Sequence, residues 1–224
     1  MSRSGEVART ADPVSDAVEA FRAGEPVCVH DAADREGETD LIYPAAAVTP
    51  DAVARMRNDA GGLVCVALGD AVAETFDLPF VQEEIDHPAA ADHDLGYDER
   101  SSFSITVNHR DTYTGITDED RALTISELGV AAADPEGVDF AGTFRAPGHV
   151  HILRAAPDLL ADREGHTELG IALAEAADLP PAVVVCEMLD DESGEALPPA
   201  GAQAYAQRHD IPYVEGAALL ERLG

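Results

Sequence analysis

The sequence predicts one α+β domain over residues 1–224, with mixed sheets that pack against helices in a layered α/β sandwich. Short apolar runs typical of buried strands are interspersed with helical patterns, and one run alternates as an antiparallel strand does. The chain has 224 residues, of which 46% are apolar, and this is enough to bury a full core. No internal repeat or linker divides the chain, so we expect a single domain.

The elements of the first half follow from their end signals and their apolar spacing. A proline in the first turn and a closing glycine predict a helix over residues 12–24, and the apolar run 26–30 predicts a buried strand. The acidic segment 34–40 is expected to connect this strand to the next element. A Thr-Pro start and a glycine stop predict a helix over 49–61, and 63–68 is the next buried strand.

The second half opens with a long polar segment, 85–100, and such connections in compact chains are usually lids or disordered. Apolar residues at every second position then predict a strand over 102–108, with its three apolar side chains on one face. A Thr-x-x-Asp capping pattern predicts a helix over 117–129. The remaining predicted elements are a strand at 149–155, a helix at 167–177, a strand at 182–188 and a helix at 217–223.

The charge balance argues against several classes of partner. Acids outnumber bases by 44 to 14, every base is arginine, and the net charge is −30. Such an excess repels nucleic acid and anionic membranes, so we expect neither as a partner. At about 1 M salt the Debye length falls to roughly 3 Å, and repulsion between exposed acids is largely screened. The composition therefore predicts a halophilic protein.

The chain contains no sequence signal for secretion. Residues 1–10 hold no apolar signal region and no apolar run approaches a membrane span, so a cytoplasmic location is expected. Three cysteines, Cys28, Cys65 and Cys186, lie in separate apolar runs. We interpret them as small buried hydrophobic residues, and Cys65 is of interest because it follows a Gly-Gly turn.

The acidic segment after the first strand is a candidate cation site. Glu36, Glu38 and Asp40 share one face if the segment is extended, and Glu36 and Asp40 share one if it is helical. Arg35 precedes them. Carboxylate oxygens suit a hard divalent ion. A solvated acidic loop is the alternative, and such loops are common in so acidic a chain.

A second polar segment lies at the start of the predicted helix 167–177. Arg163, Gly165, His166 and Thr167 place a guanidinium, a glycine, an imidazole and a hydroxyl where a phosphate binds favourably. The alternative is that Thr167 only caps the helix and His166 is an exposed loop residue. Together with the acidic segment, the functional interpretation is metal-assisted chemistry on a small phosphorylated substrate.

Two further residues have side chains suited to proton transfer. His149 follows Pro147-Gly148, a predicted rigid turn that would direct the imidazole, although a partly buried structural histidine is the alternative. Glu187 ends an apolar run, where a carboxylate needs a partner or a function. The alternative is that Glu187 is simply the first exposed residue at the end of the strand.

Together these segments resemble the 3,4-dihydroxy-2-butanone 4-phosphate synthase family over nearly the whole chain. Each motif is weak alone, but their order along the chain is specific. Gly37 and Thr39 resemble the archaeal branch, and nothing like the cyclohydrolase domain of fused bacterial members follows, so a monofunctional enzyme is expected. The motifs are residues 31–40, 60–65, 102–106, 114–121, 147–150, 163–168 and 186–187.

The resemblance implies a lyase of riboflavin biosynthesis that converts D-ribulose 5-phosphate into L-3,4-dihydroxy-2-butanone 4-phosphate and formate. It implies Mg²⁺ as cofactor, with Mn²⁺ as a substitute, and a homodimer with active sites near the subunit interface. Enolisation of a ketose needs a base near the acidic C–H bond and an electrophile at the carbonyl oxygen. A carboxylate or imidazole suits the first task and Mg²⁺ the second.

The resemblance also implies roles for individual residues. The metal ligands would be Glu36 and His166. The catalytic residues would be His149 and Glu187 as the essential acid/base pair, with Asp31 and Glu38 supporting proton transfers. The residues in contact with substrate would be Arg35, Glu36, Asp40, Thr114, Arg163, Gly165, His166, Thr167 and Glu187.

Two other classes of function stay open from the residues alone. A metal-dependent sugar-phosphate phosphatase would use a similar pocket but would release inorganic phosphate. A non-catalytic phosphate-binding module would bind its ligand without turnover, and His149 and Glu187 would then have no evident purpose. Formate release from ribulose 5-phosphate distinguishes the synthase from both.

Overall fold

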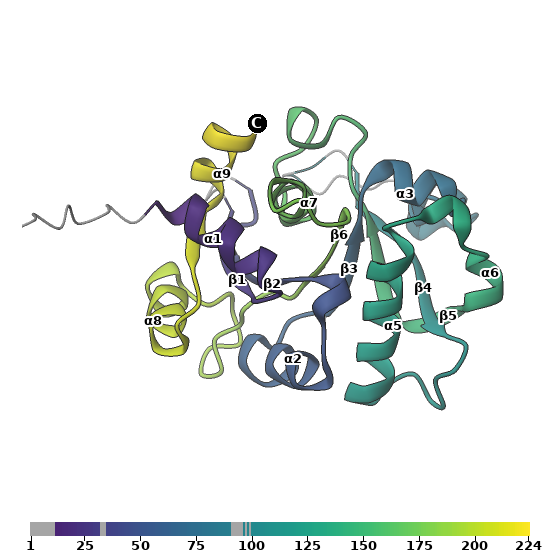
Figure 1. Ribbon diagram of the computed structural model, residues 1–224, viewed down its shortest axis with the longest axis horizontal. Coiled ribbons are helices and arrows are strands. Elements are labelled where there is room, and N and C mark those ends of the chain that lie inside the picture. The colour runs from purple at the N-terminus through teal and green to yellow at the C-terminus, as the bar shows by residue number, and fades with distance from the viewer. Residues whose placement is uncertain (1–11, 32–34, 91–95, 97, 99) are drawn as a thin grey trace, which may run out of the picture.

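The computed structural model describes residues 12–31, 35–90, 96, 98 and 100–224, and within them one mixed seven-stranded sheet lies between two layers of helices (Figure 1). The strands are β1 (Val27–His30), β2 (Thr39–Pro44), β3 (Cys65–Leu68), β4 (Phe103–His109), β5 (Phe144–Arg154), β6 (Ala182–Val185) and β7 (Tyr213–Glu215). Their order is β4-β5-β3-β6-β2-β1-β7. The β1–β7 and β3–β5 pairs are parallel, and the other pairs are antiparallel.

Helices cover both faces of this sheet, each over its own apolar core. The first layer contains α1 (Pro13–Arg22), α7 (His166–Ala176) and α9 (Gly216–Leu223). The second contains α2 (Pro50–Arg55), α3 (Asp70–Thr75), α5 (Asp118–Ala131) and α8 (Pro199–His209). Two short helices, α4 (Val81–Glu84) and α6 (Phe140–Thr143), complete the set within the described ranges. The α+β class and the layered arrangement are therefore confirmed.

The predicted helix starts are confirmed by their caps. Side-chain oxygens of Asp12, Thr49 and Thr117 accept hydrogen bonds from amides in the first turns of α1, α2 and α5. The helix that begins with α2 continues as a π turn over Met56–Ala60 and stops at Gly61, whose φ is 90°. Glycine adopts this left-handed conformation without steric cost, which is why the helix ends there.

The clean alternation predicted for residues 102–108 is wrong. Phe103 is 37% exposed whereas Ser104 is buried. The pairing between β4 and β5 shifts register after Phe103 and again after Val107. Each shift changes which side chains face the core, because successive residues of a strand point to opposite faces.

Four predicted boundaries are also wrong. The strand predicted at 149–155 begins at Phe144. The segment 34–40 is not a connection throughout, because β2 begins at Thr39, and the predicted strand 182–188 ends its regular pairing at Val185. Gly129 does not end its helix but lies inside α5, where a Cβ would come within 2.3 Å of the Ala46 main-chain nitrogen. This glycine allows α5 to approach the main chain closely, and it does not act as a stop signal.

Several elements lack a sequence-based counterpart. They are β2, β7, α3, α4, α6 and α8, which are short or rich in alanine and so give weak periodicity. The rigid turn predicted at Pro147-Gly148 is also wrong, because both residues lie within β5. Gly148 is needed there because a Cβ would come within 1.9 Å of the Val107 carbonyl carbon on β4.

Parts of two expectations lie outside the described residues. They are the expectation for residues 1–10 and, within the 85–100 segment, that for residues 91–95, 97 and 99. The described part of that segment includes a 3₁₀ turn at Pro88–Ala90 and the side chain of Asp98. In the ranges that the structure describes, no helix has both the length and the apolar character to cross a bilayer.

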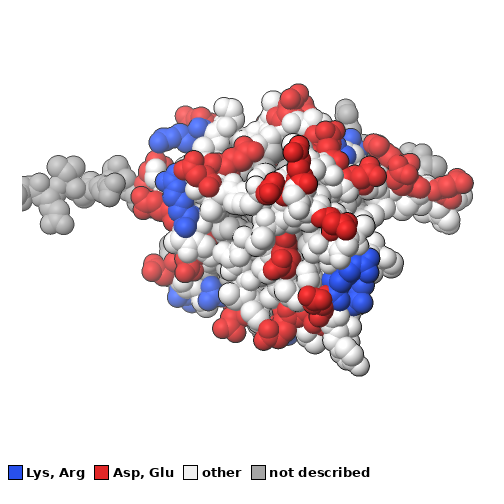
Figure 2. Space-filling view, turned by 45° about the vertical axis from the view of Figure 1, so that its right-hand side comes forward, with Lys and Arg blue, Asp and Glu red and all other residues white. Residues whose placement is uncertain are grey.

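Acidic side chains are spread over the face shown in Figure 2, with few arginines among them. We expect the urea midpoint for unfolding to rise when NaCl is raised from about 0.1 M to about 1 M. The Debye length falls from roughly 10 Å to roughly 3 Å over this range, so the repulsion between exposed acids that opposes folding is screened. Chemical denaturation at each salt concentration measures this. Urea is used because it leaves the ionic strength unchanged, and a midpoint independent of NaCl would contradict the halophilic interpretation.

Candidate active site

The acidic segment turns back on itself between β1 and β2. Asp31 follows β1, and its two carboxylate oxygens accept hydrogen bonds from the amides of Glu38 at 3.0 Å and Glu36 at 3.3 Å. The Asp31 amide in turn donates to the Glu38 carbonyl at 3.1 Å. These bonds fix the segment, and the side chains of Glu36, Glu38 and Asp40 line one cavity.

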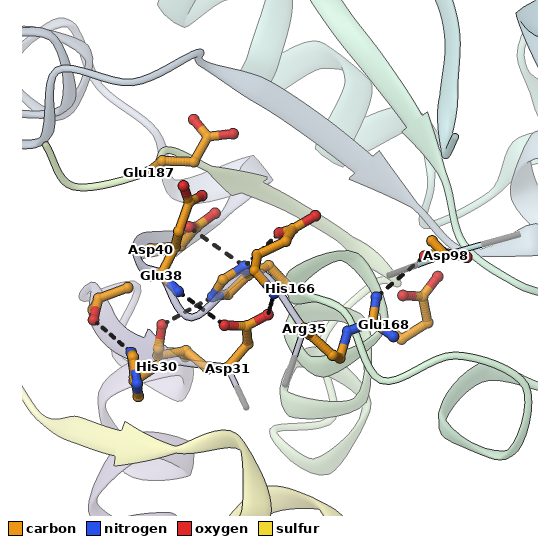
Figure 3. Close-up of polar contacts among 12 residues, drawn as sticks. His30, Asp31, Arg35, Glu38, Asp40, Asp98, His166, Glu168 and Glu187 are labelled. Carbon is orange, nitrogen blue, oxygen red and sulfur yellow. Dashed lines mark hydrogen bonds and ion pairs between the residues drawn. The ribbon is translucent and has the colours of Figure 1, made fainter. Parts of the chain in front are cut away.

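His166, the first residue of α7, lies against this segment (Figure 3). Its Nε2–H donates to the Val29 carbonyl at 3.2 Å, and its Nδ1 lies 3.6 Å from Glu36 Oε2 and 3.5 Å from Asp40 Oδ1. The imidazole is buried, and the N-cap of α7 is Gly165, which supplies no capping side chain. The alternative of an exposed loop histidine beside a capping Thr167 is therefore wrong.

Asp40 and His166 form a coupled buried pair. Burial raises the pKa of Asp40 to about 8, although His166 opposes this shift. Burial alone would lower the pKa of His166, but Asp40, Glu36 and Asp31 raise it to about 9. Because the two groups are 3.5 Å apart, they titrate as a pair. At neutral pH the pair therefore retains a proton that it shares.

Two arginines meet at the start of α7. Arg163 donates through Nη1 to Glu168 at 2.9 Å and through Nε to Asp98, while Arg35 donates to the same Asp98 carboxylate at 3.1 Å. A Cβ on Gly165 would lie 2.8 Å from Arg163 Nη1 and 3.2 Å from Arg35 Nη2, so glycine lets both guanidinium groups approach. The uncapped helix start and the two cations favour an anion at this position.

Burial raises the pKa of Asp98, but Arg163 and Arg35 outweigh it, and the pKa of that carboxyl is lowered. Asp98 is therefore held as a carboxylate against both guanidinium groups. Glu168 is 0% exposed and also accepts a hydrogen bond from the Ala156 amide at 3.0 Å. Its carboxylate holds Arg163 through Nη1, whereas Asp98 is bound through Nε.

Glu187 is held at the cavity wall by the chain that follows Gly61. Its Oε2 accepts a hydrogen bond from the Leu63 amide at 2.7 Å, and its carbonyl accepts one from the Gly62 amide at 3.0 Å. A Cβ on Gly62 would lie 2.4 Å from Glu187 Oε2. The Gly-Gly sequence is thus required for the main chain to pass this carboxylate.

One cavity of about 390 Å³ joins most of the predicted site. The sequence-predicted residues that line it are Arg35, Glu36, Glu38, Asp40, Arg163, His166, Thr167 and Glu187. Lining residues to which the sequence assigned no role are Cys65, Ser101, Ser102, Phe103, Leu153 and Val185. The motif at 102–106 and the Gly-Gly-x-x-Cys pattern were the signals that could have placed several of these residues at the site.

The buried thiols fit the structural interpretation of the cysteines. All three are free and buried, and burial raises the pKa of each thiol. Cys65 lines the cavity but is only 2% exposed. A thiol with a raised pKa holds little thiolate at neutral pH, so Cys65 contributes a small apolar wall.

Four predicted site residues do not line this cavity, but two of them, Asp31 and Gly165, adjoin its lining residues His166 and Arg163. The other two, His149 and Thr114, lie apart from it. His149 is exposed on β5 and hydrogen-bonds to Asn108 on β4. Thr114 is exposed in the loop before α5, where its hydroxyl donates to Asp120 at 3.2 Å. The chain by itself therefore does not bring these two side chains together with the acidic cluster.

The donor set fits a divalent cation. Asp31, Glu36 and His166 each offer a ligand atom, and these atoms lie within 4.8 Å of one another. Oδ1 of Asp40 is buried, faces His166, and accepts no hydrogen bond from the described residues. Two carboxylates, one imidazole and an adjacent unsatisfied carboxylate oxygen are suitable ligands for Mg²⁺ or Mn²⁺.

The fold and the site define a layered α+β protein whose pocket combines an acidic cluster suited to a cation with a pair of arginines suited to an anion. A family model described as 3,4-dihydroxy-2-butanone 4-phosphate synthase matches residues 15–222. The synthase of Archaeoglobus fulgidus is 49% identical over 219 residues, with 92% of both chains covered. That of Methanosarcina acetivorans is 47% identical over 221 residues, covering 93% of this chain and 90% of the relative. The chain belongs to the 3,4-dihydroxy-2-butanone 4-phosphate synthase family.

Solved structures of the family share the fold. A crystal structure of the Candida albicans synthase aligns with a TM-score of 0.79 at 32% identity, covering 95% of this chain and 98% of that one. A synthase in complex with two magnesium ions aligns with a TM-score of 0.76 at 30% identity, covering 93% and 95%. The two layers around a mixed sheet are thus common to this chain and its structural relatives.

Proposed function

We propose that the protein is a lyase of riboflavin biosynthesis that converts D-ribulose 5-phosphate into L-3,4-dihydroxy-2-butanone 4-phosphate and formate. The observation that supports this best is the meeting of Glu36 and His166, 3.6 Å apart, in a cavity whose other side carries Arg35 and Arg163. A metal site and an anion site so close together suit a small phosphorylated sugar. Family membership makes this sugar the first substrate to test.

Glu36 and His166, with Asp31 beside them, would hold Mg²⁺, for which Mn²⁺ would substitute. When bound, the ion supplies an electrophile for the substrate oxygens and stabilises the negative charge that develops on them. The protein prepares the ligands: the Val29 carbonyl holds His166 through Nε2, so Nδ1 faces the acidic cluster. The backbone amides of Glu36 and Glu38 likewise fix Asp31, because they donate hydrogen bonds to its carboxylate.

The phosphate would bind at the start of α7, to Arg35, Arg163 and the amide of Thr167. Asp98 now bonds both guanidinium groups, so the phosphate has to displace this carboxylate. Arg163 stays in place during the exchange because Glu168 holds it from the buried side. The anion site therefore keeps its geometry with either occupant.

Proton transfers would fall to carboxylates on the cavity wall. Glu187, which is fixed by the Leu63 amide, would take a proton from a substrate carbon. Burial raises the pKa of Glu38, and the neighbouring Glu36 and Glu187 charges raise it further. A carboxyl whose pKa is raised takes up a proton more readily, which suits the support of proton transfer.

His149 and Thr114 would act from a second copy of the chain. Both side chains are exposed and outside the cavity of their own subunit. Exposed apolar side chains, Tyr113 at 93% and Ile116 at 52%, flank Thr114, and an exposed apolar surface is typical of an interface. A homodimer that covers this surface would bring the imidazole and the hydroxyl to the partner's pocket.

The decisive assay is formate release from D-ribulose 5-phosphate in high salt, with and without a chelator. We expect formate in stoichiometric amount with the four-carbon phosphate, and loss of activity when the metal is removed. Release of inorganic phosphate in place of formate would establish the phosphatase alternative. Binding of the sugar phosphate without either product would leave only the binding-module alternative.

Metal binding is expected to strengthen as the pH rises toward 9. The pKa of His166 is raised to about 9, so below that pH a cation bound at Nδ1 has to displace a proton. The affinity should rise by up to about tenfold per pH unit below pH 9 if one proton is displaced. Calorimetric Mg²⁺ titrations in two buffers of different ionisation enthalpy give the number of protons released. Binding without proton release would contradict the assignment of His166 as a ligand.

A further inference from the structure

The side chain of Asn108 is buried beneath the exposed imidazole of His149. Asn108 lies on β4 and is only 4% exposed, and a buried amide is normally hydrogen-bonded. Its Oδ1 accepts the main-chain N–H of His149 at 2.8 Å, and its Nδ2 lies 3.2 Å from Nδ1 of the same residue. One buried side chain thus holds both the backbone and the ring of a single histidine on the neighbouring strand.

The bond from the His149 main chain determines which atom of the Asn108 amide faces the ring. A backbone N–H can only donate, so the amide atom that meets it is the carbonyl oxygen, and the NH₂ group is left for the ring. Oδ1 also lies 3.3 Å from Nδ1, but Nδ2 is closer at 3.2 Å, so we take the NH₂ group as the partner of the ring. In the neutral ring, Nδ1 is then the acceptor and the proton resides on Nε2.

Gly115 closes the opposite side of the same amide. A Cβ at Gly115 would lie 2.0 Å from Asn108 Nδ2, and the φ of Gly115 is +88°. The loop that carries Thr114 therefore packs directly on Asn108. This contact connects two proposed site residues that lie outside the cavity, His149 and Thr114, and it restricts rotation of the amide between them.

We propose that Asn108 is a positioning residue, which engages Nδ1 of His149 and presents Nε2–H to the substrate. The inference rests on the proposed function, in which His149 acts on the substrate. In its neutral state the ring donates a hydrogen bond from Nε2 to a substrate oxygen and loses no proton. The side-chain amide of Asn108 is buried and so does not reach the substrate itself. Asn108 therefore acts only through His149.

The test is Asn108→Asp, which keeps the size of the side chain and the acceptor for the His149 main chain. It replaces the NH₂ donor with a carboxylate oxygen, so Nδ1 must now carry the proton. ¹⁵N NMR of the ring nitrogens reports the tautomer, and the His149→Gln spectrum identifies the signals among the 8 histidines. We expect the Nε2–H form in the native chain and the Nδ1–H form in the variant.

Asn58→Asp is the matched control, because Asn58 is exposed and lies in the π turn Met56–Ala60, away from β4, where it accepts a hydrogen bond from Arg57. It should keep both the native tautomer and the native activity. In Asn108→Asp, kcat for formate release should fall by roughly 10²-fold with little change in KM, since the ring is misdirected while the phosphate site is intact. A kcat equal to that of Asn58→Asp would overturn the positioning role.

Asn108→Ala covers the case in which the buried carboxylate prevents folding. It leaves space for water and frees the ring, so we expect the His149 ring signals to shift and kcat to fall. Ring signals and kcat equal to those of the native chain would refute the contact. The NMR measurement does not depend on turnover. If the native chain releases no formate, the proposed function fails while the ring measurement still decides whether Asn108 fixes His149.

Discussion

Glu36→Gln and His166→Ala are each expected to lower kcat/KM for formate release by roughly 10³-fold or more. A metal ion contributes several kcal/mol to stabilising charge in the transition state, and each 1.36 kcal/mol is worth about tenfold in rate. Each substitution removes one of the two groups that meet 3.6 Å apart at the proposed cation site. Steady-state kinetics at saturating Mg²⁺ measures the loss, and calorimetry measures the weakened Mg²⁺ binding.

Glu164→Gln is the control for this pair. Glu164 is exposed and lies next to Arg163 in the chain, so the variant makes the same chemical change beside the pocket but outside the acidic cluster. It should retain near-native kinetics and Mg²⁺ affinity. Near-native formate release from Glu36→Gln or His166→Ala would refute the proposed ligands, provided that circular dichroism shows each variant folded.

Arg163→Met is expected to destabilise the fold by about 3–5 kcal/mol, which is typical of breaking a buried ion pair from one side. Glu168 is 0% exposed and loses the Nη1 donor that now lies 2.9 Å away. The hydrogen bond that Glu168 accepts from the Ala156 amide at 3.0 Å does not balance a full charge. Urea denaturation at fixed high salt gives the change in the free energy of unfolding.

The double variant Arg163→Met/Glu168→Gln separates charge from packing. Replacing the stranded carboxylate with a neutral amide should restore much of the lost stability, as a double-mutant cycle would show. Acid should also reduce the deficit of Arg163→Met. Burial raises the pKa of Glu168 and Arg163 opposes this, so in the variant the folded state binds the proton more tightly than the unfolded state. Stability that falls steadily on acidification relative to the native chain would contradict this account.

The sequence was sufficient for features that depend on neighbouring residues. The starts of α1, α2 and α5 were predicted because a capping side chain and its amide partner lie within three residues of each other. The chemical types at the site were also readable, because the carboxylates of 36–40 and the Arg-x-Gly-His-Thr run are contiguous in the chain. The strand β4 was predicted, but the alternation of its side chains between the two faces was not, because its register shifts arise from pairing with β5.

Only the tertiary structure decided which of these groups meet. Glu36 and His166 are 130 positions apart, and they come together because the β1–β2 connection lies against the start of α7. The contact of Asp98 with both arginines and the burial of Glu168 likewise depend on distant segments. The sequence alone determined the chemical types of the ligands and the approximate start of α7, because those signals are local. The packing of α7 on the sheet determined the site, because its contacts join residues that no sequence spacing relates.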